Sequence, residues 1–217
     1  MSSARCCRSS TVRARVELFL ASSNKGKLAE FHALAVTDAP GVTDACAEIE
    51  LLPGFDSLPS FEEGAPTFAE NAAGKALHYS RLEEGLVFAD DSGLVVPELG
   101  GAPGVRSARY AGEHATDAQR IAKLHGELRG KTGAERAAYF VCAIAVAERG
   151  RALAIVTARV DGEILEEPKG SGGFGYDPVF YFPPLKKTFA ELSPEEKNQC
   201  SHRGKAFRKL LAGLSGP

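Results

Sequence analysis

The sequence contains no tryptophan, one methionine and five cysteines in 217 residues. Five is an odd number, no two of the cysteines form a C-x-x-C pair, and no cluster of histidine and cysteine has zinc-ligand spacing. This pattern indicates neither a disulfide scaffold nor a zinc site. We therefore expect reduced thiols in a cytoplasmic protein.

Long apolar runs and an excess of positive charge are also missing. The longest apolar stretches, 137–147 and 152–160, fall well short of the roughly 20 residues that a membrane helix needs. Lysine and arginine number 26 against 28 acidic residues, a net charge of -2, which gives no global positive field for a nucleic-acid backbone. We expect a soluble protein that binds neither a membrane nor a nucleic acid.

Two common phosphate-binding motifs are absent as well. The Walker pattern G-x-x-x-x-G-K-[ST] does not occur. Residues 170–175 do match G-x-G-x-x-G, but the dinucleotide fingerprint requires a helix next, and Tyr176-Asp177-Pro178 opposes one. A phosphate group bound by this chain must therefore be held by another device.

What the sequence does have is material for one core. With 44% apolar and 25% charged residues over this length, a single compact domain is the expectation. Residues 1–15 are basic and serine-rich without the apolar stretch of a secretory signal, so we interpret them as a disordered extension. Residues 16–217 then form the domain.

The hydrophobic pattern predicts an α/β fold with a mixed sheet. A β-hairpin is expected within an otherwise alternating strand and helix pattern, and this combination requires antiparallel pairing beside parallel pairing. Thr67 with Glu70, and Ser193 with Pro194 and Glu196, have the spacing of helix starts. The expected strands are 16–21, 48–52, 86–89, 94–96 and the hairpin 137–148 with 152–160; the expected helices are 26–35, 68–80, 116–128, a helix after Ser193, and 201–214.

The first candidate for chemistry is the polar segment Ser22–Lys27. It follows a predicted strand and precedes a predicted helix, and it combines hydroxyl, amide and ammonium groups. A helix start offers free N–H groups to an anion, so the segment suits a phosphate. An ordinary polar loop with a capping side chain explains it equally well.

The second candidate is acidic. Glu62 and Glu63 precede a capped helix, and Asp90 and Asp91 follow the strand 86–89. Carboxylates suit Mg²⁺ and can accept a proton from water. Adjacent strand residues point to opposite faces, so at most one aspartate enters a given cleft. The alternative is a turn in which these side chains cap their own backbone.

The third candidate joins Phe174–Asp177 to Ser201–Gly204. Aromatic rings stack on any base, and arginine or backbone N–H groups recognise a purine O6 acceptor. The alternative is that Phe174 and Tyr176 belong to the core and that His202 merely begins the last helix.

Six segments in this order resemble the inosine triphosphatase family of noncanonical purine nucleoside triphosphate pyrophosphatases, in its bacterial form. The segments are SSNKGK, TFAENAAGKA, FADDSGL, GGAPGVRSARYAG, GGFGYDPVF and SHRGKAF. The resemblance extends from Val16 to Leu214. It implies an elongated mixed β-sheet with flanking helices and two lobes around a central nucleotide cleft. It also implies a homodimer that uses Mg²⁺ to hydrolyse dITP, ITP or XTP to the monophosphate and pyrophosphate.

The resemblance also implies roles for individual residues. Asp91 matches the family's general base and metal ligand, and a loop glutamate would be a second metal ligand. In the segment 62–68 the family more often has the glycine one position later and lacks the proline, which leaves open which glutamate reaches the metal. Glu63 is favoured, with Glu62 close behind. The implied substrate-binding residues are Ser22, Ser23, Asn24, Lys25, Gly26, Lys27, Lys75, Ser92, Phe174, Gly175, Tyr176, Asp177, Lys197, His202 and Arg203.

Base choice has a physical explanation in this scheme. Donation from Arg203 or from backbone N–H groups would suit O6 of hypoxanthine and xanthine but would face the amino group of adenine. Guanine shares O6, so this contact does not exclude GTP. The alternatives are a Maf-like pyrophosphatase acting on modified or pyrimidine nucleotides, and a nucleotide sensor that does not hydrolyse.

Overall fold

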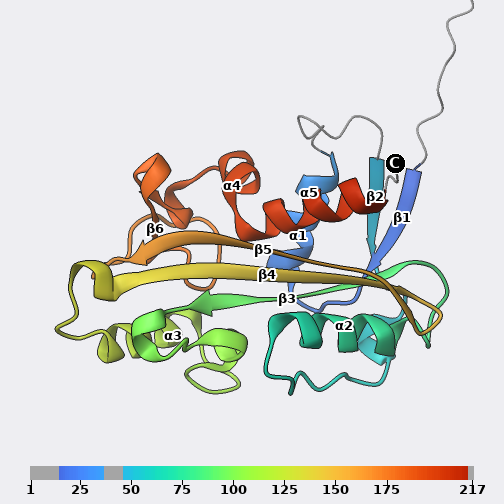
Figure 1. Ribbon diagram of the computed structural model, residues 1–217, viewed down its shortest axis with the longest axis horizontal. Coiled ribbons are helices and arrows are strands. Elements are labelled where there is room, and N and C mark those ends of the chain that lie inside the picture. The colour runs from blue at the N-terminus through green and yellow to red at the C-terminus, as the bar shows by residue number, and fades with distance from the viewer. Residues whose placement is uncertain (1–14, 37–45, 215–217) are drawn as a thin grey trace, which may run out of the picture.

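Within residues 15–36 and 46–214, the part of the chain that the computed structural model describes, seven strands form one mixed sheet. Their order is β2-β1-β3-β4-β5-β6-β7. The strands are β1 (Arg15–Leu20), β2 (Cys46–Leu51), β3 (Val87–Val95), β4 (Ala137–Glu148), β5 (Arg151–Ile164), β6 (Phe180–Phe182) and β7 (Lys187–Thr188). β1 is parallel to β2 and β3, and the later pairs are antiparallel. The predicted mixed α/β fold is confirmed (Figure 1).

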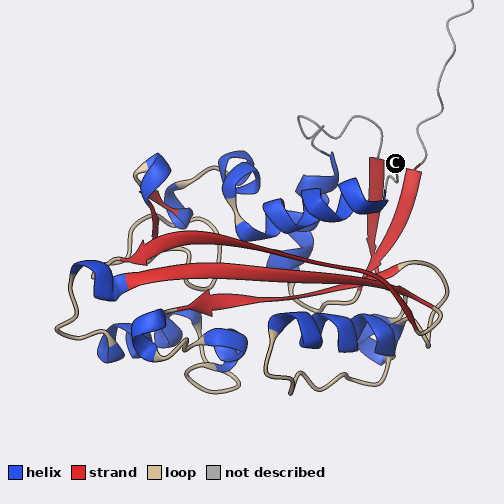
Figure 2. Cartoon of the chain, in the orientation of Figure 1, coloured by secondary structure: helices blue, strands red, loops and turns tan. Residues whose placement is uncertain are grey.

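Helices cover both faces of the sheet. The helices are α1 (Lys25–Val36), α2 (Phe68–Tyr79), α3 (Asp117–Glu127), α4 (Pro194–Cys200) and α5 (His202–Leu214). In Figure 1, α1, α4 and α5 lie above the sheet, and α2 and α3 lie below it. The long β4–β5 hairpin runs along the molecule and connects the two ends (Figure 2).

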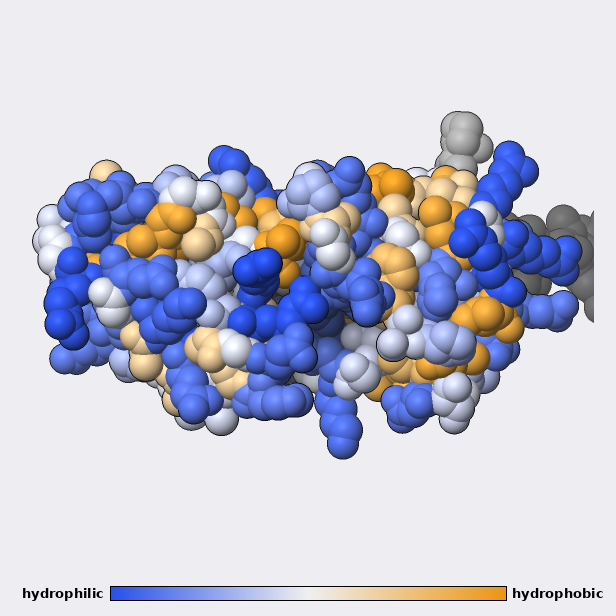
Figure 3. Space-filling view, turned by 90° about the horizontal axis from the view of Figure 1, so that it is seen from below, coloured by the Kyte–Doolittle hydropathy of each residue, from blue (hydrophilic) through white to orange (hydrophobic). Residues whose placement is uncertain are grey.

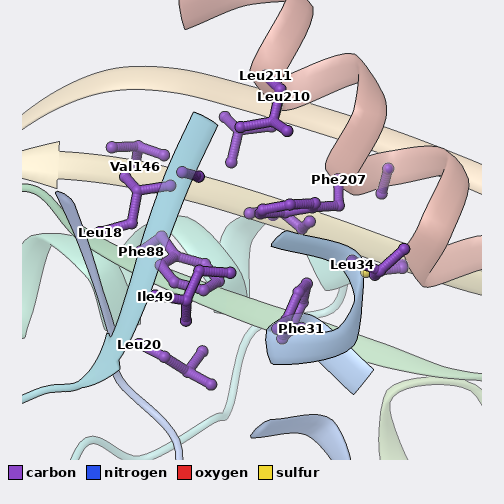
Figure 4. Packing of buried hydrophobic residues seen from close by; sticks show 14 of the residues in the cluster. Leu18, Leu20, Phe31, Leu34, Ile49, Phe88, Val146, Phe207, Leu210 and Leu211 are labelled. Carbon is purple, nitrogen blue, oxygen red and sulfur yellow. The ribbon is translucent and has the colours of Figure 1, made fainter. Parts of the chain in front are cut away.

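Three apolar clusters hold these layers together. The cluster above the sheet packs α1 and α5 on β1 to β5 (Figure 4). On α5, Ala206, Phe207, Leu210 and Leu211 are buried at spacings of one, three and four residues, which directs one stripe of the helix to the sheet. A second cluster packs α2 against the sheet, and a third brings together α3, the end of β4 and β5 beside it, and the segment 176–192. The gap between these last two clusters is where the site lies.

Local sequence rules predicted most element boundaries. Thr67 Oγ1 accepts from Glu70 N (3.2 Å) and so caps α2. The Thr67 hydroxyl in turn donates to the Glu70 carboxylate (2.7 Å). Ser193 forms the predicted capping box with Glu196, with Pro194 as the first helical residue. The predicted hairpin is confirmed, and its turn residues Arg149 and Gly150 both have positive φ.

The prediction for Asp90 and Asp91 was wrong in one respect. From the sequence, Asp90 and Asp91 were expected after a strand that ends at Ala89, with a turn at the aspartates as the alternative. β3 instead continues through both of them to Val95, because its nine residues pair without interruption with β4. Gly93 is needed for close packing and not for a turn: a Cβ there would lie 2.3 Å from Ser107 Oγ.

The predicted N-terminal extension, 1–15, lies outside the described residues except for Arg15, which begins β1 beside Cys46. Among the helices of the described residues, none has the length and apolar content to cross a membrane.

Candidate active site

A cleft of about 840 Å³ opens between the α2 end and the α3 end of the sheet. Figure 3 shows the face below the sheet, which is hollowed near its middle among hydrophilic residues. Most of the predicted site residues line the cleft: Ser22, Ser23, Asn24, Lys27, Glu62, Glu63, Lys75, Asp91, Ser92, Phe174, Gly175, Tyr176, Asp177, Lys197, His202 and Arg203.

Lys25 and Gly26 are not among the lining residues. Lys25 is exposed at the start of α1. Gly26 lies under the ring of Phe174, and a Cβ at this position would be 2.8 Å from that ring. Gly26 therefore allows two parts of the cleft to approach each other closely.

The polar loop is both a helix cap and a wall of the cleft. Asn24 Oδ1 accepts from Lys27 N (3.1 Å), and Asn24 N donates to Ser22 Oγ (3.2 Å). The capping interpretation of this segment is thus confirmed, and the capping residues also line the cleft. The side chain of Lys27 turns inward, with its Nζ 2.9 Å from Asp90 Oδ2.

The two aspartates of β3 have different environments. Asp90 is fully buried beside Lys27 and Arg203. Burial raises its pKa, but these two cations outweigh burial and hold the pKa below its ordinary value. Asp91 lines the cleft and accepts from Asn71 Nδ2 (3.0 Å). Burial, with the charge of Glu63, raises the pKa of Asp91 to about 6.

The acidic loop reaches the cleft beside Asp91. Glu63 is partly buried and its Oε1 lies 2.5 Å from Lys75 Nζ, whereas Glu62 is exposed. Across the mouth of the cleft, Arg109 Nη2 donates to the backbone carbonyl of Glu63 (3.0 Å). In the described residues, no group of three or more His, Cys, Asp or Glu side chains is assembled to hold a metal ion.

A chain of six buried charges with alternating signs runs behind the cleft. Its members, in order, are Asp177, Lys197, Glu30, Arg203, Asp90 and Lys27. Lys197 Nζ lies 2.5 Å from Asp177 and 2.6 Å from Glu30, and Arg203 pairs with Glu30 and approaches Asp90 at 3.7 Å. This ionic chain couples the aromatic end of the cleft to its Lys27 end.

The aromatic end forms a flat slot. The ring of His202 stacks on Phe140 with centroids 4.7 Å apart, and burial holds the pKa of His202 well below 6.5, so the imidazole is neutral. Its Nδ1 is buried and finds no hydrogen-bond partner among the described residues. Phe174 lies under the Arg203 guanidinium at 5.5 Å. A planar ring with polar edges suits this slot.

The loop that carries Phe174 is fixed from the α3 side. Gly175 N donates to Asp117 Oδ2 (2.7 Å), and the Tyr176 hydroxyl donates to the Ser107 carbonyl (3.0 Å). Tyr176 is therefore a core residue that also lines the cleft, as the alternative interpretation proposed in part.

Several residues that organise the site were missed by the sequence analysis. Glu30 and Asn71 contact predicted residues from α1 and α2, and Arg109 and Asp117 contact them from the α3 end. For Glu30 a pattern was available, because it lies three residues after Lys27 on one helix face. The other contacts join segments far apart in sequence, and no local pattern identifies them.

Comparison with known proteins places the chain among close relatives. It matches the Ham1 family over residues 18–213. It is 53% identical over 194 residues to a dITP/XTP pyrophosphatase of Geobacillus kaustophilus, covering 89% of this chain and 92% of that protein. A dITP/XTP pyrophosphatase of Desulfotalea psychrophila is 46% identical over 195 residues, covering 90% of this chain and 83% of that protein.

Solved structures agree with these relatives. A Ham1 protein from Coxiella burnetii superposes with a TM-score of 0.79 at 43% identity, covering 93% of this chain and 100% of the other. The nucleoside-triphosphatase / dITP/XTP pyrophosphatase from Mycobacterium abscessus has a TM-score of 0.65 at 36% identity, covering 90% and 99%.

Proposed function

The chain belongs to the Ham1 family, and from this premise we propose that it hydrolyses dITP, ITP and XTP to the monophosphate and pyrophosphate, and so removes noncanonical purines from the nucleotide pool. The observation that carries the proposal is Asp91, a buried carboxylate that lines the same cleft as Glu63 and Lys75 and accepts from Asn71 Nδ2 at 3.0 Å. Because the chain belongs to the Ham1 family, the alternative of a Maf-like pyrophosphatase is set aside.

The acidic residues fit a bound Mg²⁺. The charge of Glu63 contributes to the raised pKa of Asp91, and a divalent cation held by both carboxylates would relieve that repulsion. Their oxygens are the hard ligands that Mg²⁺ prefers, and such sites usually complete their coordination with substrate phosphates and water. Asp91 and Glu63 would hold the ion, with the exposed Glu62 at the margin of the site. When bound, Mg²⁺ neutralises phosphate charge.

The cations of the cleft would hold the triphosphate. Lys27, with Ser22, Ser23 and Asn24, offers positive charge and donors at the start of α1. Lys75 adds an ammonium group beside Glu63. These groups stabilise the negative charge that develops on the departing pyrophosphate.

Asp91 is the proton acceptor in this scheme. Above about pH 6 its carboxylate is ionised and takes a proton from a water molecule. The water oxygen then forms a bond to the α-phosphorus, and the bond from that phosphorus to the bridging oxygen of pyrophosphate breaks. Pyrophosphate leaves with the electron pair of that bond, and the nucleoside monophosphate remains.

The aromatic slot would bind the purine. Phe174 lines the cleft below the Arg203 guanidinium, and His202, which stacks on Phe140, lines the same cleft together with Ser92, Lys197 and Asp177. Both terminal nitrogens of Arg203 already donate, to Glu30 and to Ser92. Recognition of O6 by Arg203 would therefore come from a guanidinium held in a fixed orientation, which penalises adenine.

We also propose that the protein is a cytoplasmic homodimer. The support is that Leu153 and Ile155, two positions apart on β5, are about half exposed, at 47% and 50%, and burying neighbouring apolar side chains of this kind would stabilise the contact with a second copy. Light scattering tests the assembly: a dimeric mass that becomes monomeric in Ile155→Arg supports this surface, and a monomeric wild type rejects it.

A nucleotide panel tests the activity. The purified protein is incubated with dITP, ITP, XTP, GTP, ATP and dTTP, with and without Mg²⁺, and all phosphate products are resolved. Mg²⁺-dependent monophosphate and pyrophosphate from the hypoxanthine and xanthine nucleotides support the proposal. A diphosphate and inorganic phosphate would mean attack at the γ-phosphorus, and binding without turnover would mean a sensor.

A further inference from the structure

Asn71 touches both acidic parts of the cleft. This residue lies in the first turns of α2 and is 1% exposed. Its Nδ2 donates to Asp91 Oδ2 (3.0 Å) and to the Ala65 carbonyl (3.3 Å), and its Oδ1 accepts from Ala65 N (2.9 Å). One amide therefore connects a carboxylate on β3 to the backbone two residues after Glu63.

The contacts of Asn71 require an amide. Its nitrogen is the donor toward Asp91, and its oxygen is the acceptor toward the loop. An aspartate would place a second carboxylate against Asp91, and an apolar residue would leave the Ala65 N–H unpaired. Arg109 holds the same loop from the other side through the Glu63 carbonyl.

We propose that Asn71 is a positioning residue for the pyrophosphatase reaction. It sets the separation between Asp91 and the Glu62–Ala65 loop, so that Asp91 and Glu63 can share one divalent cation while Asp91 still faces the attacking water. This inference rests on the proposed function. Mutation of a residue that orients a metal ligand typically lowers metal affinity or activity by roughly 10- to 100-fold.

The test compares Asn71→Ala and Asn71→Leu with Thr67→Ala. Thr67 caps the same helix, and its side chain bonds to Glu70 and not to Asp91 or Glu63. Thr67→Ala therefore loosens α2 but keeps the side-chain amide of Asn71. Leucine fills the volume of asparagine, which keeps a second variant available if alanine does not fold. Circular dichroism verifies that each variant is folded.

Two quantities are measured for each protein: Mn²⁺ affinity by electron paramagnetic resonance, and kcat and KM for dITP at saturating Mg²⁺. We expect both Asn71 variants to lose about 10- to 100-fold in Mn²⁺ affinity and in kcat, with the KM for dITP near the wild-type value. Thr67→Ala should keep the wild-type Mn²⁺ affinity and kcat.

Wild-type Mn²⁺ affinity in both Asn71 variants would overturn the proposal, and so would an equal loss in Thr67→Ala. An inactive wild type would refute the proposed function instead, and the Mn²⁺ titration would still decide whether Asn71 arranges the carboxylates.

Discussion

Replacing Asp91 by asparagine should make the protein more stable at neutral and alkaline pH while it abolishes turnover. The wild-type carboxylate is 5% exposed and lies near Glu63. Its pKa is raised from 3.8 to about 6, so its ionisation opposes folding. Asparagine has nearly the same shape and can still accept from Asn71, but it carries no charge.

The magnitude follows from linkage. When folding raises the pKa of a carboxyl group, the folded protein loses stability as the pH rises through that raised pKa. The pKa change from 3.8 to about 6 corresponds to about 3 kcal/mol once Asp91 is fully ionised. The Asn variant avoids this loss, a small part of which is already present at pH 4, so its advantage in the free energy of unfolding should grow by about 2.5 kcal/mol between pH 4 and pH 8.

Urea denaturation of both proteins in EDTA, at several pH values, measures this difference. The Tm at pH 8 should also rise by roughly 6–12 °C relative to the wild type. Excess Mg²⁺ should reduce this difference in stability between the two proteins, because an ion that binds only the folded wild type stabilises the wild type. As a control, Asp161→Asn removes a carboxylate that is 68% exposed and should show little dependence on pH.

If the wild type and Asp91→Asn differ in the free energy of unfolding by the same amount at pH 4 and at pH 8, the reasoning is refuted, because the charge on Asp91 is then not what opposes folding. A variant less stable than the wild type at pH 8 would refute it as well.

Three further predictions concern other parts of the molecule. Arg203→Ala should lower the preference for ITP over ATP, in kcat/KM, by about tenfold or more; an unchanged ratio would remove Arg203 from base selection. The pKa of His202 lies well below 6.5, so its neutral form favours folding, and the free energy of unfolding should fall below pH 6.5 by up to about 1.4 kcal/mol per pH unit from this residue. In His202→Phe, urea titrations should show that this contribution is gone, and an unaltered slope would contradict the argument. Phe207 is 1% exposed against Phe31, so Phe207→Ala should destabilise the fold by about 3–5 kcal/mol, and urea denaturation that gives under 1 kcal/mol would show that the core refills the space.

The sequence predicted those features that neighbouring residues determine. The capping residues Thr67 and Ser193 and the turn of the predicted hairpin, at Arg149-Gly150, act within a few positions of the chain, and each is confirmed. The length of β3 was underestimated because the Asp-Asp-Ser-Gly segment is typical of turns, and only pairing with β4 keeps it extended.

The candidate site also divides into residues that the local sequence identifies and residues that it does not. The residues that line the cleft were found mostly through motifs, whereas the residues that hold them were not. Asn71 and Asp91 are 20 positions apart, and Arg203 and Glu30 are 173 apart. No periodicity or spacing rule reaches across such separations, since they depend on how the helices pack on the sheet.

The ionic chain from Asp177 to Lys27 has a consequence for how such a protein can evolve. Three anions and three cations alternate, so the six charges sum to zero, and none of the six side chains is more than 15% exposed. The two ends of the chain depend on one partner each: neutralising Lys197 leaves Asp177 without its cation, and neutralising Asp90 leaves Lys27 without its anion. Such a loss costs about 3–5 kcal/mol, a large part of the 5–15 kcal/mol by which a domain is stable. A lineage that remodels these positions keeps more of its stability when it exchanges opposite charges together.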